Sequence, residues 1–442
     1  MNIDARVPNN ALRALLTECA WSGGDLARAV NAVAAESGLR LSYGRASAAQ
    51  WLAGGRPRPP VPELVAEALS RRLGRTVTVS GAGFPAGPGL PPKAGTLPAR
   101  LVRLAGEPAK RVPSRLDVYR LALLTVPGFP EAAAAPGTGT VSRAELDAAR
   151  AALKVFSDAD GTLGGGAVRA PVAGYLANTV SPWLHAGATS PAVHRELLQV
   201  AAELTYLCGF LCFDDNLHGV AQRYYRVALK LAAEAEDEFR YAITLRAMSV
   251  QARSLGHHAE ALRLAEAATG TVGTRAAPQT RAFLHGQLAV AAAATGDRRR
   301  ASAGLATAEH ELARAEGEVG AVGAYHFGSF AHQRAAVAAC LDNRPGAIRA
   351  MRESLRNRPR NEYRARAVTL ARLAELQAAH GGVEEAVGSW HRFLDIYPAV
   401  HSARLDAAVR TLRQCLRPHR NLPAARELLN RVAGLAPRTL AA

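Results

Sequence analysis

A period of about forty residues recurs through the second half of this sequence and constrains its fold more than any other feature. Each unit has a helical stretch, a turn with Gly, Asp or Asn, and a second helical stretch opened by a small residue. Six such residues align at spacings of 40, 40, 46, 39 and 39, namely Ala221, Ala261, Ala301, Ala347, Ala386 and Ala425. Because one helix pair cannot bury its apolar face alone, the pattern predicts an α-solenoid of stacked units.

The spacings inside each unit resemble those of the tetratricopeptide repeat. In the fifth unit, Gly381-Gly382 precedes Ala386, a large residue follows at Trp390, and Pro398 closes the unit. The period is longer than the 34 residues of that family and nearer to the 40–47 of HEAT and armadillo repeats. The resemblance implies a repeat domain over residues 196–442, with long helices or loops and an irregular superhelix.

A solenoid of this kind has a concave groove lined by the first helix of each pair. Arg246 with Arg253, and Arg410 with Arg417, lie seven residues apart, which is two turns along one helix face. Such pairs predict an anionic ligand, or a short peptide held by its C-terminal carboxylate. The alternative is that they are solvated arginines of an arginine-rich chain. By register the groove would receive Tyr206, Phe210, Arg246, Arg253, His332, Arg410 and Arg417.

Four short helices are predicted ahead of the repeats. Asn9 or Asn10 caps the first, Gly38 stops the second, and Gly54-Gly55 followed by Pro57 stops the third. Short helices at this spacing are typical of a helix-turn-helix layout, in which the third enters the DNA major groove. Their predicted ranges are 11–20, 25–36, 46–53 and 61–73, the last with Leu64, Ala68 and Leu69 on its apolar side.

The third of these helices divides into an inner and an outer face. Ala49, Trp51 and Leu52 are predicted to pack inward, which leaves a polar set outside. An arginine can pair with guanine and a glutamine with adenine, so this face suits base recognition. An ordinary amphipathic surface helix is the alternative. The predicted DNA-contacting residues are Arg45, Ser47, Gln50, Arg56 and Arg58.

Two strings carry a resemblance to the lambda-repressor-like (XRE-type) DNA-binding domain: Asp25-Leu26-Ala27, and the run from Gln50 to Pro57. The loop at 39–44 departs from that family because it is longer. The resemblance implies an all-α DNA-binding domain over residues 1–80. Joined to tetratricopeptide-like repeats, it is similar to bacterial transcription regulators whose repeat domain dimerises and, in some members, binds a signalling peptide. Residues 222–232 also look like a regulator group of filamentous high-GC bacteria.

Between these parts, residues 81–115 are predicted to be a Gly/Pro-rich basic linker, and 116–195 a helical connecting region. The linker carries Arg100, Arg103, Lys110, Arg111 and Arg115. These side chains either touch DNA phosphates or belong to a solvated tether.

The charge of the chain favours a polyanionic partner. Lys and Arg number 54 against 37 Asp and Glu, which gives a net charge of +17. A balance of this size favours double-stranded DNA, although any polyanion satisfies it. Most of the basic residues are arginine, and Ala, Gly and Pro are abundant, so a high-GC genome accounts for part of the excess. The main hypothesis is therefore a homodimeric DNA-binding transcription regulator, and the alternative is a non-enzymatic protein–protein interaction scaffold.

A second alternative rests on the string Asp158-Ala-Asp160-Gly161-Thr162, which matches the D-x-D-G-T signature of haloacid-dehalogenase-type phosphatases. That chemistry needs a strand to deliver both aspartates to a Mg²⁺ ion. The preceding residues are helical in composition and no β-α alternation follows. We therefore expect no enzyme, and read residues 158–166 as a Gly-rich turn between two helices.

The five cysteines are scattered and predict reduced thiols of a cytoplasmic protein. Cys208 with Cys212, and His257 with His258, do not complete a ligand set, so no metal or cofactor is expected. The first twenty residues lack the apolar segment of a secretory signal, and we expect no apolar run long enough to span a membrane.

Overall fold

The computed structural model describes residues 7–37, 39–85, 96–106, 118–124, 129, 139–315 and 325–435. Helices build this part of the chain, and its only β pairing is an isolated bridge between Val141 and Ala188. The all-α prediction is confirmed. The expected helix stop at Gly38 and the basic residues Lys110, Arg111 and Arg115 lie outside the described residues.

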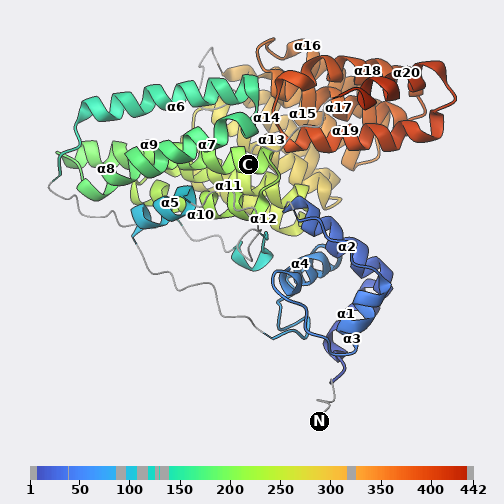
Figure 1. The fold of residues 1–442 in the computed structure, drawn as a ribbon. Coiled ribbons are helices and arrows are strands. Elements are labelled where there is room, and N and C mark those ends of the chain that lie inside the picture. The colour runs from blue at the N-terminus through green and yellow to red at the C-terminus, as the bar shows by residue number, and fades with distance from the viewer. Residues whose placement is uncertain are drawn as a thin grey trace.

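Within the described residues, the repeat domain consists of six antiparallel helix pairs, and Figure 1 shows them stacked side by side. Each of the six aligned alanines lies in the first turn of a second helix and is fully buried, at 0% exposure. Since a methyl group at that position lets paired helices approach closely, the predicted repeat is confirmed. The pairs are α9 Pro191–Asp214 with α10 His218–Glu234, α11 Glu238–Ser254 with α12 His258–Val272, α13 Pro278–Ala294 with α14 Arg298–Arg314, α15 Phe327–Cys340 with α16 Arg344–Asn357, α17 Tyr363–Ala379 with α18 Val383–Ile396, and α19 Ala403–Leu416 with α20 Pro423–Ala433.

The helices ahead of the repeats share a core with the first repeat units. Leu101 on α5 is 0% exposed and packs in the same cluster as Leu204 and Leu245. Residues 97–106 are therefore a packed helix, in contrast to the predicted linker, and the first repeat helix begins at Pro191. These elements are α5 Leu97–Gly106, α6 Arg143–Leu163, α7 Gly165–Tyr175, α8 Ser181–Ala186, and the short η1 Leu121–Leu123 and η2 Leu176–Val180.

The D-x-D string lies inside α6, and its second aspartate links α6 to the repeat helix α17. This contact closes the superhelix. Asp160 is buried and accepts a 2.8 Å hydrogen bond from Arg364 of α17, 204 residues away. Asp158 is exposed and pairs with Lys154, because residues two apart point to opposite sides of a helix. The phosphatase alternative is therefore wrong about the geometry, since the two carboxylates do not face one site. The predicted Gly-rich turn is also wrong over 158–163, which is helical.

The turn after α6 makes further contacts with the end of the repeat domain, at His401. Gly164 adopts a φ of +84°, and a Cβ there would lie 2.4 Å from the backbone oxygen of His401. His401 donates its N–H to Leu163 O at 2.6 Å and accepts from Gly166 N at 3.0 Å. Only glycine combines the left-handed backbone with this approach. The segment ahead of the repeats thus contacts the last two helix pairs, and Figure 1 shows α6 running across the repeat helices.

Helices α1 Asn10–Cys19, α2 Gly23–Glu36, α3 Arg45–Leu52 and α4 Val61–Leu73 form an N-terminal module that extends to residue 85. Asn9 caps α1, and Ser22 with Asp25 forms a capping box on α2. On α3 the buried residues are Ala48 and Trp51, while Ala49 is exposed and Leu52 is half-buried. The predicted inward position of Ala49 is wrong because Ala48, three residues before Trp51, shares its face and packs on Gly23.

Helix α4 was predicted to have one apolar side, yet all of Val61–Ser70 is buried. One face packs on α1 and α2, and the other meets the repeat domain. There Glu67 Oε1 lies 2.7 Å from His257 Nε2, and the Tyr119 ring stacks on the His257 ring with centroids 5.4 Å apart. Arg71 joins Glu67 at 2.9 Å and also pairs with Glu36. The module is docked on the repeats, in contrast to the loose tether that the linker predicts.

Helix α9 is long and apolar enough to cross a membrane by length and composition, so the expectation that no such run exists is wrong. Of its most apolar window, 78% is buried inside the protein. Its place in the first repeat core, with Cys208 and Cys212 almost fully buried, accounts for that composition.

Candidate functional site

The inner face of the superhelix carries four guanidinium groups that we call the inner arginine cluster: Arg246, Arg253, Arg364 and Arg404. Three of them lie over aromatic rings. The guanidinium carbon of Arg246 is 3.6 Å from the centroid of Phe283, that of Arg364 is 4.7 Å from Phe210, and that of Arg404 is 5.0 Å from Phe213. Partly desolvated contacts of this type stabilise a cation by about 0.5–2 kcal/mol, so the rings hold these charges in place.

Arg246 and Arg253 differ from the other two because neither makes a hydrogen bond or an ion pair with any residue that the structure describes. Both extend from α11, two helical turns apart. Burial lowers the pKa of each guanidinium, and the tyrosines Tyr206, Tyr225 and Tyr325 partly oppose this for Arg246. A desolvated cation without a counter-charge is costly unless an anion joins it. This pair is therefore the centre of the candidate site.

Arg364 and Arg404 lie beside acidic groups. Arg364 binds Asp160 at 2.8 Å and lies 4.0 Å from Asp214, while Arg404 is 3.9 Å from the same Asp214. Burial raises the pKa of Asp160, and the positive charge of Arg364 lowers it in part. These contacts tie α17 and α19 to α6 and α9, so this half of the cluster has a structural role.

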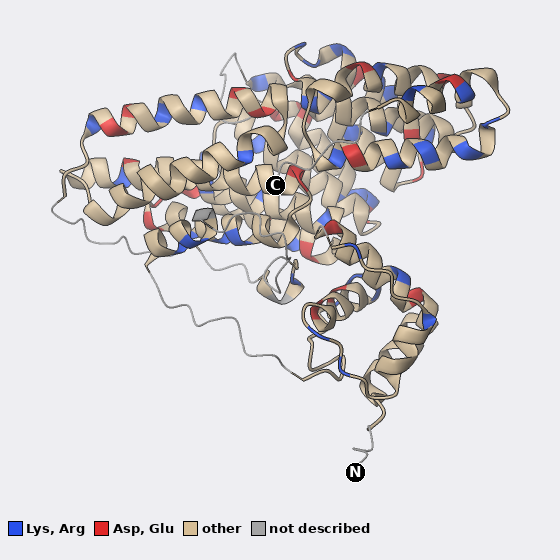
Figure 2. Cartoon of the chain, in the orientation of Figure 1, with Lys and Arg blue, Asp and Glu red and all other residues tan. Residues whose placement is uncertain are grey.

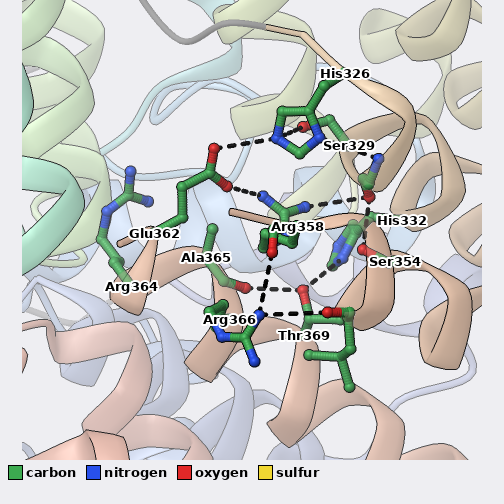
Figure 3. Close-up of polar contacts among 12 residues, drawn as sticks. His326, Ser329, His332, Ser354, Arg358, Glu362, Arg364, Ala365, Arg366 and Thr369 are labelled. Atoms are coloured by element: carbon green, nitrogen blue, oxygen red, sulfur yellow. Dashed lines mark hydrogen bonds and ion pairs between the residues drawn. The ribbon is translucent and has the colours of Figure 1, made fainter. Parts of the chain in front are cut away.

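His332 belongs to a polar network that joins α15, α16 and α17 (Figure 3). Its Nδ1 lies 3.2 Å from Thr369 Oγ1, which in turn donates to Ala365 O. Nearby, Glu362 binds both Arg358 and His326. Burial, with the surrounding arginines, lowers the pKa of His332 to about 3. At neutral pH it is therefore an uncharged residue that already has a hydrogen-bond partner.

The structure brings five of the seven predicted groove residues to the inner face. Tyr206 and Phe210 join Arg246, Arg253 and His332 there. Burial raises the pKa of Tyr206, and the positive charge of Arg246 opposes this in part. Arg410 on α19 and Arg417 on the short η5 helix Arg417–His419 are exposed instead. Neither contacts the cluster through a hydrogen bond, ion pair or ring within the described residues.

Sequence reasoning missed Arg364, Arg404 and Phe283. A signal was present, because Arg364 and Arg404 are forty residues apart and each is the second residue of a first helix. Applying the repeat period to the first helices, rather than only to the alanines of the second helices, would have found them. Phe283 has no such counterpart, and only the packing of α13 against α11 places it under Arg246.

The predicted DNA-contacting residues lie on or just after α3. Arg45, Gln50, Arg56 and Arg58 are exposed and Ser47 is half-buried. The side chain of Asn31 binds both the N–H and the C=O of Tyr43, at 3.0 and 2.9 Å, and so fixes the loop that leads into α3. In Figure 1, α4 and one end of α2 lie on the side of the module that faces the repeat domain, and α3 lies on the far side.

Comparisons with known proteins describe parts of the chain. Residues 12–85 match a family model described as the SP15 N-terminal domain. A search of curated proteins finds no match. Among solved structures, the crystal structure of the APC/C hetero-tetramer Cut9-Hcn1 is similar with a TM-score of 0.34 and 14% identity, over 65% of this chain and 47% of that chain. The C-terminal part is a helical-repeat domain, and the XRE-type assignment of the module stays a prediction.

Proposed function

We propose that this chain is a non-enzymatic interaction protein whose repeat domain binds an acidic segment of a partner protein. The observation that carries the proposal is the pair Arg246 and Arg253, two partly buried guanidinium groups without a counter-charge on the inner face of the solenoid. A carboxylate can accept two parallel hydrogen bonds from one guanidinium, and each charged hydrogen bond contributes about 1.5–3 kcal/mol. The adjoining rings of Phe283 and Tyr206 offer apolar contact to the same segment.

The test uses the full chain and fluorescein-labelled acidic octapeptides with free C-termini, measured by fluorescence anisotropy. The double variant Arg246→Gln/Arg253→Gln should weaken the best binder at least tenfold. The matched control is Arg410→Gln/Arg417→Gln, a pair at the same seven-residue spacing that is exposed; it should change the affinity less than twofold. If both variants lose affinity equally, the peptide binds through the net charge of the protein and not through Arg246 and Arg253.

A second candidate function is sequence-specific DNA binding by α3 in a homodimer. It is supported by the exposed side chains of Arg45 and Gln50, by the fixed loop before α3, and by the resemblance of the module to XRE-type domains. Basic side chains are spread over both parts of the protein, so charge alone does not distinguish DNA binding from other polyanion binding (Figure 2).

DNA binding is tested by selecting bound sequences from random duplexes and measuring gel shifts at several salt concentrations. Gln50→Ala should weaken binding to the selected sequence by about 1–3 kcal/mol and relax its preference at one base pair. The control is Arg13→Ala, an exposed change on α1. If no sequence is enriched, or if both variants bind alike, α3 does not read DNA.

A further inference from the structure

A second basic site lies between α16, α17 and α18. It is an open cavity of about 470 Å³ whose polar lining includes the exposed side chains of Arg352, Arg356 and Arg392. The volume falls within the range of about 300–1,000 Å³ that small-molecule sites occupy. None of these three arginines belongs to the inner arginine cluster, so the cavity is independent of the function proposed above.

The spacing of the lining residues explains why the three helices form one site. Helix α18 contributes Glu385, Gly388, Ser389 and Arg392, at intervals of three and four residues. Side chains at these intervals share one face of a helix. Helix α16 contributes Arg352, Leu355 and Arg356 by the same rule, and α17 contributes Leu373 and Gln377, which are four residues apart.

The charge of the cavity is strongly positive. Three guanidinium groups face a single carboxylate, and that pairing is loose, since Arg352 lies 3.8 Å from Glu385. Arg356 and Arg392 make no hydrogen bond or ion pair with any described residue. The lining therefore carries about two positive charges in excess, which matches the charge of about −1.5 to −2 on a phosphate monoester at neutral pH.

Gln377 lines the cavity and offers a hydrogen-bond donor in a fixed orientation. Gln377 is only 3% exposed, and its Oε1 accepts a 2.6 Å hydrogen bond from Ser389 Oγ. The amide nitrogen of Gln377 makes no hydrogen bond to any residue that the structure describes. Because the oxygen is held by Ser389, the amide group is fixed with its N–H bonds available to a bound acceptor. A donor held in this orientation at the wall of an open cavity can bind an acceptor of a ligand in place of water.

Gly388 keeps the cavity open. It lies in the middle of α18, where glycine destabilises a helix by about 1 kcal/mol relative to alanine. A Cβ at this position would meet nothing within 4 Å, so helix packing does not require a glycine. Leu355 and Leu373 complete the lining with apolar surface for the body of a ligand.

From these observations we propose that the cavity between α16, α17 and α18 binds a small-molecule phosphate monoester. The guanidinium groups of Arg356 and Arg392 hold the phosphoryl oxygens, Gln377 donates to a further acceptor, and the leucines contact the apolar part. The excess of positive charge distinguishes this ligand class from neutral molecules of the same size.

The experiment is isothermal titration calorimetry on the full chain with three probes: inorganic phosphate, glucose 6-phosphate and adenosine 5′-monophosphate. Adenosine serves as the uncharged control. We expect at least one phosphate monoester to bind with a dissociation constant below about 1 mM and adenosine to bind at least tenfold more weakly. Failure of both monoesters to bind, or equal binding of adenosine, would overturn the proposal.

Two test variants and two control variants locate the site. Arg356→Gln/Arg392→Gln should weaken binding at least tenfold, and Gly388→Leu should abolish it by filling the cavity. Arg349→Gln, an exposed change on α16 outside the cavity, should leave it unchanged, as should Arg246→Gln/Arg253→Gln on the inner face. Unfolding midpoints within 3 °C of the wild type confirm that each variant folds. Binding that survives Gly388→Leu and the double variant would place the ligand elsewhere and refute the site.

Discussion

Two groups of arginines in this protein differ in whether a carboxylate lies beside the guanidinium group. Arg364 binds the buried Asp160 of the distant helix α6, and Arg71 binds Glu67, the buried carboxylate of its own helix that also contacts His257. Arg246 and Arg253 lie deep on the inner face and bind no carboxylate among the described residues. The comparison indicates that the paired arginines close the fold, while the unpaired ones are available to an external anion.

The largest loss of stability is expected from breaking the ion pair between α6 and α17 that closes the superhelix. Asp160→Ala removes the hydrogen-bonded partner of the buried Arg364 and leaves Asp214 at 4.0 Å, and removing one partner of a buried pair costs about 3–5 kcal/mol. The free energy of unfolding, measured by urea denaturation, should fall by that amount. Asp158→Ala, two residues away on the exposed side, should change it by less than about 0.5 kcal/mol. Similar effects from both changes would show that the ion pair does not hold the closure.

A smaller loss of stability is expected from removing a polar contact between the N-terminal module and the repeat domain. Glu67→Ala removes the carboxylate shared by Arg71 and His257 and leaves two buried groups without it, at a cost of about 1–3 kcal/mol. Hydrogen exchange should then rise along α4 and near Tyr119. Glu18→Ala breaks an exposed pair with Arg75 in the same module and is the control. Unchanged exchange in Glu67→Ala would mean that apolar packing alone docks the module.

The histidine among the inner arginines gives a pH test. His332 titrates near pH 3 in the folded protein and near 6.5 when unfolded, because burial disfavours its charged form. Between these values the unfolded chain binds a proton that the folded protein does not, so stability falls as the pH drops below 6.5. His332→Asn should reduce the loss of stability between pH 7 and pH 5. An identical loss in the variant would contradict the buried, uncharged histidine.

The smallest effect on stability is expected from the unpaired arginines. Arg246→Gln/Arg253→Gln removes two desolvated charges that no described carboxylate compensates, so the free energy of unfolding should stay within about 1 kcal/mol or rise. Thermal unfolding measures this directly. A loss comparable to that of Asp160→Ala would place these arginines with the structural group and remove the basis of the proposed binding site.

The sequence by itself determined the repeat domain. A small residue recurs about every forty positions because each helix pair needs close packing at the same point, and all six alanines are buried as the period predicts. It also determined the helices of the module, whose ends follow local rules such as the Asn9 cap and the Ser22 capping box. These features depend on residues that are close together in the chain, so local sequence patterns predict them.

Only the tertiary structure decided which polar residues are structural and which are free. Asp160 resembles part of a catalytic motif until Arg364, 204 residues away, is seen beside it. Glu67 resembles a solvated helix residue until His257 meets it across 190 residues. Arg410 and Arg417 have the same spacing as Arg246 and Arg253, yet only the latter pair is partly buried. The physical reason is that burial and counter-charge depend on the superhelical closure, and no local sequence pattern contains that information.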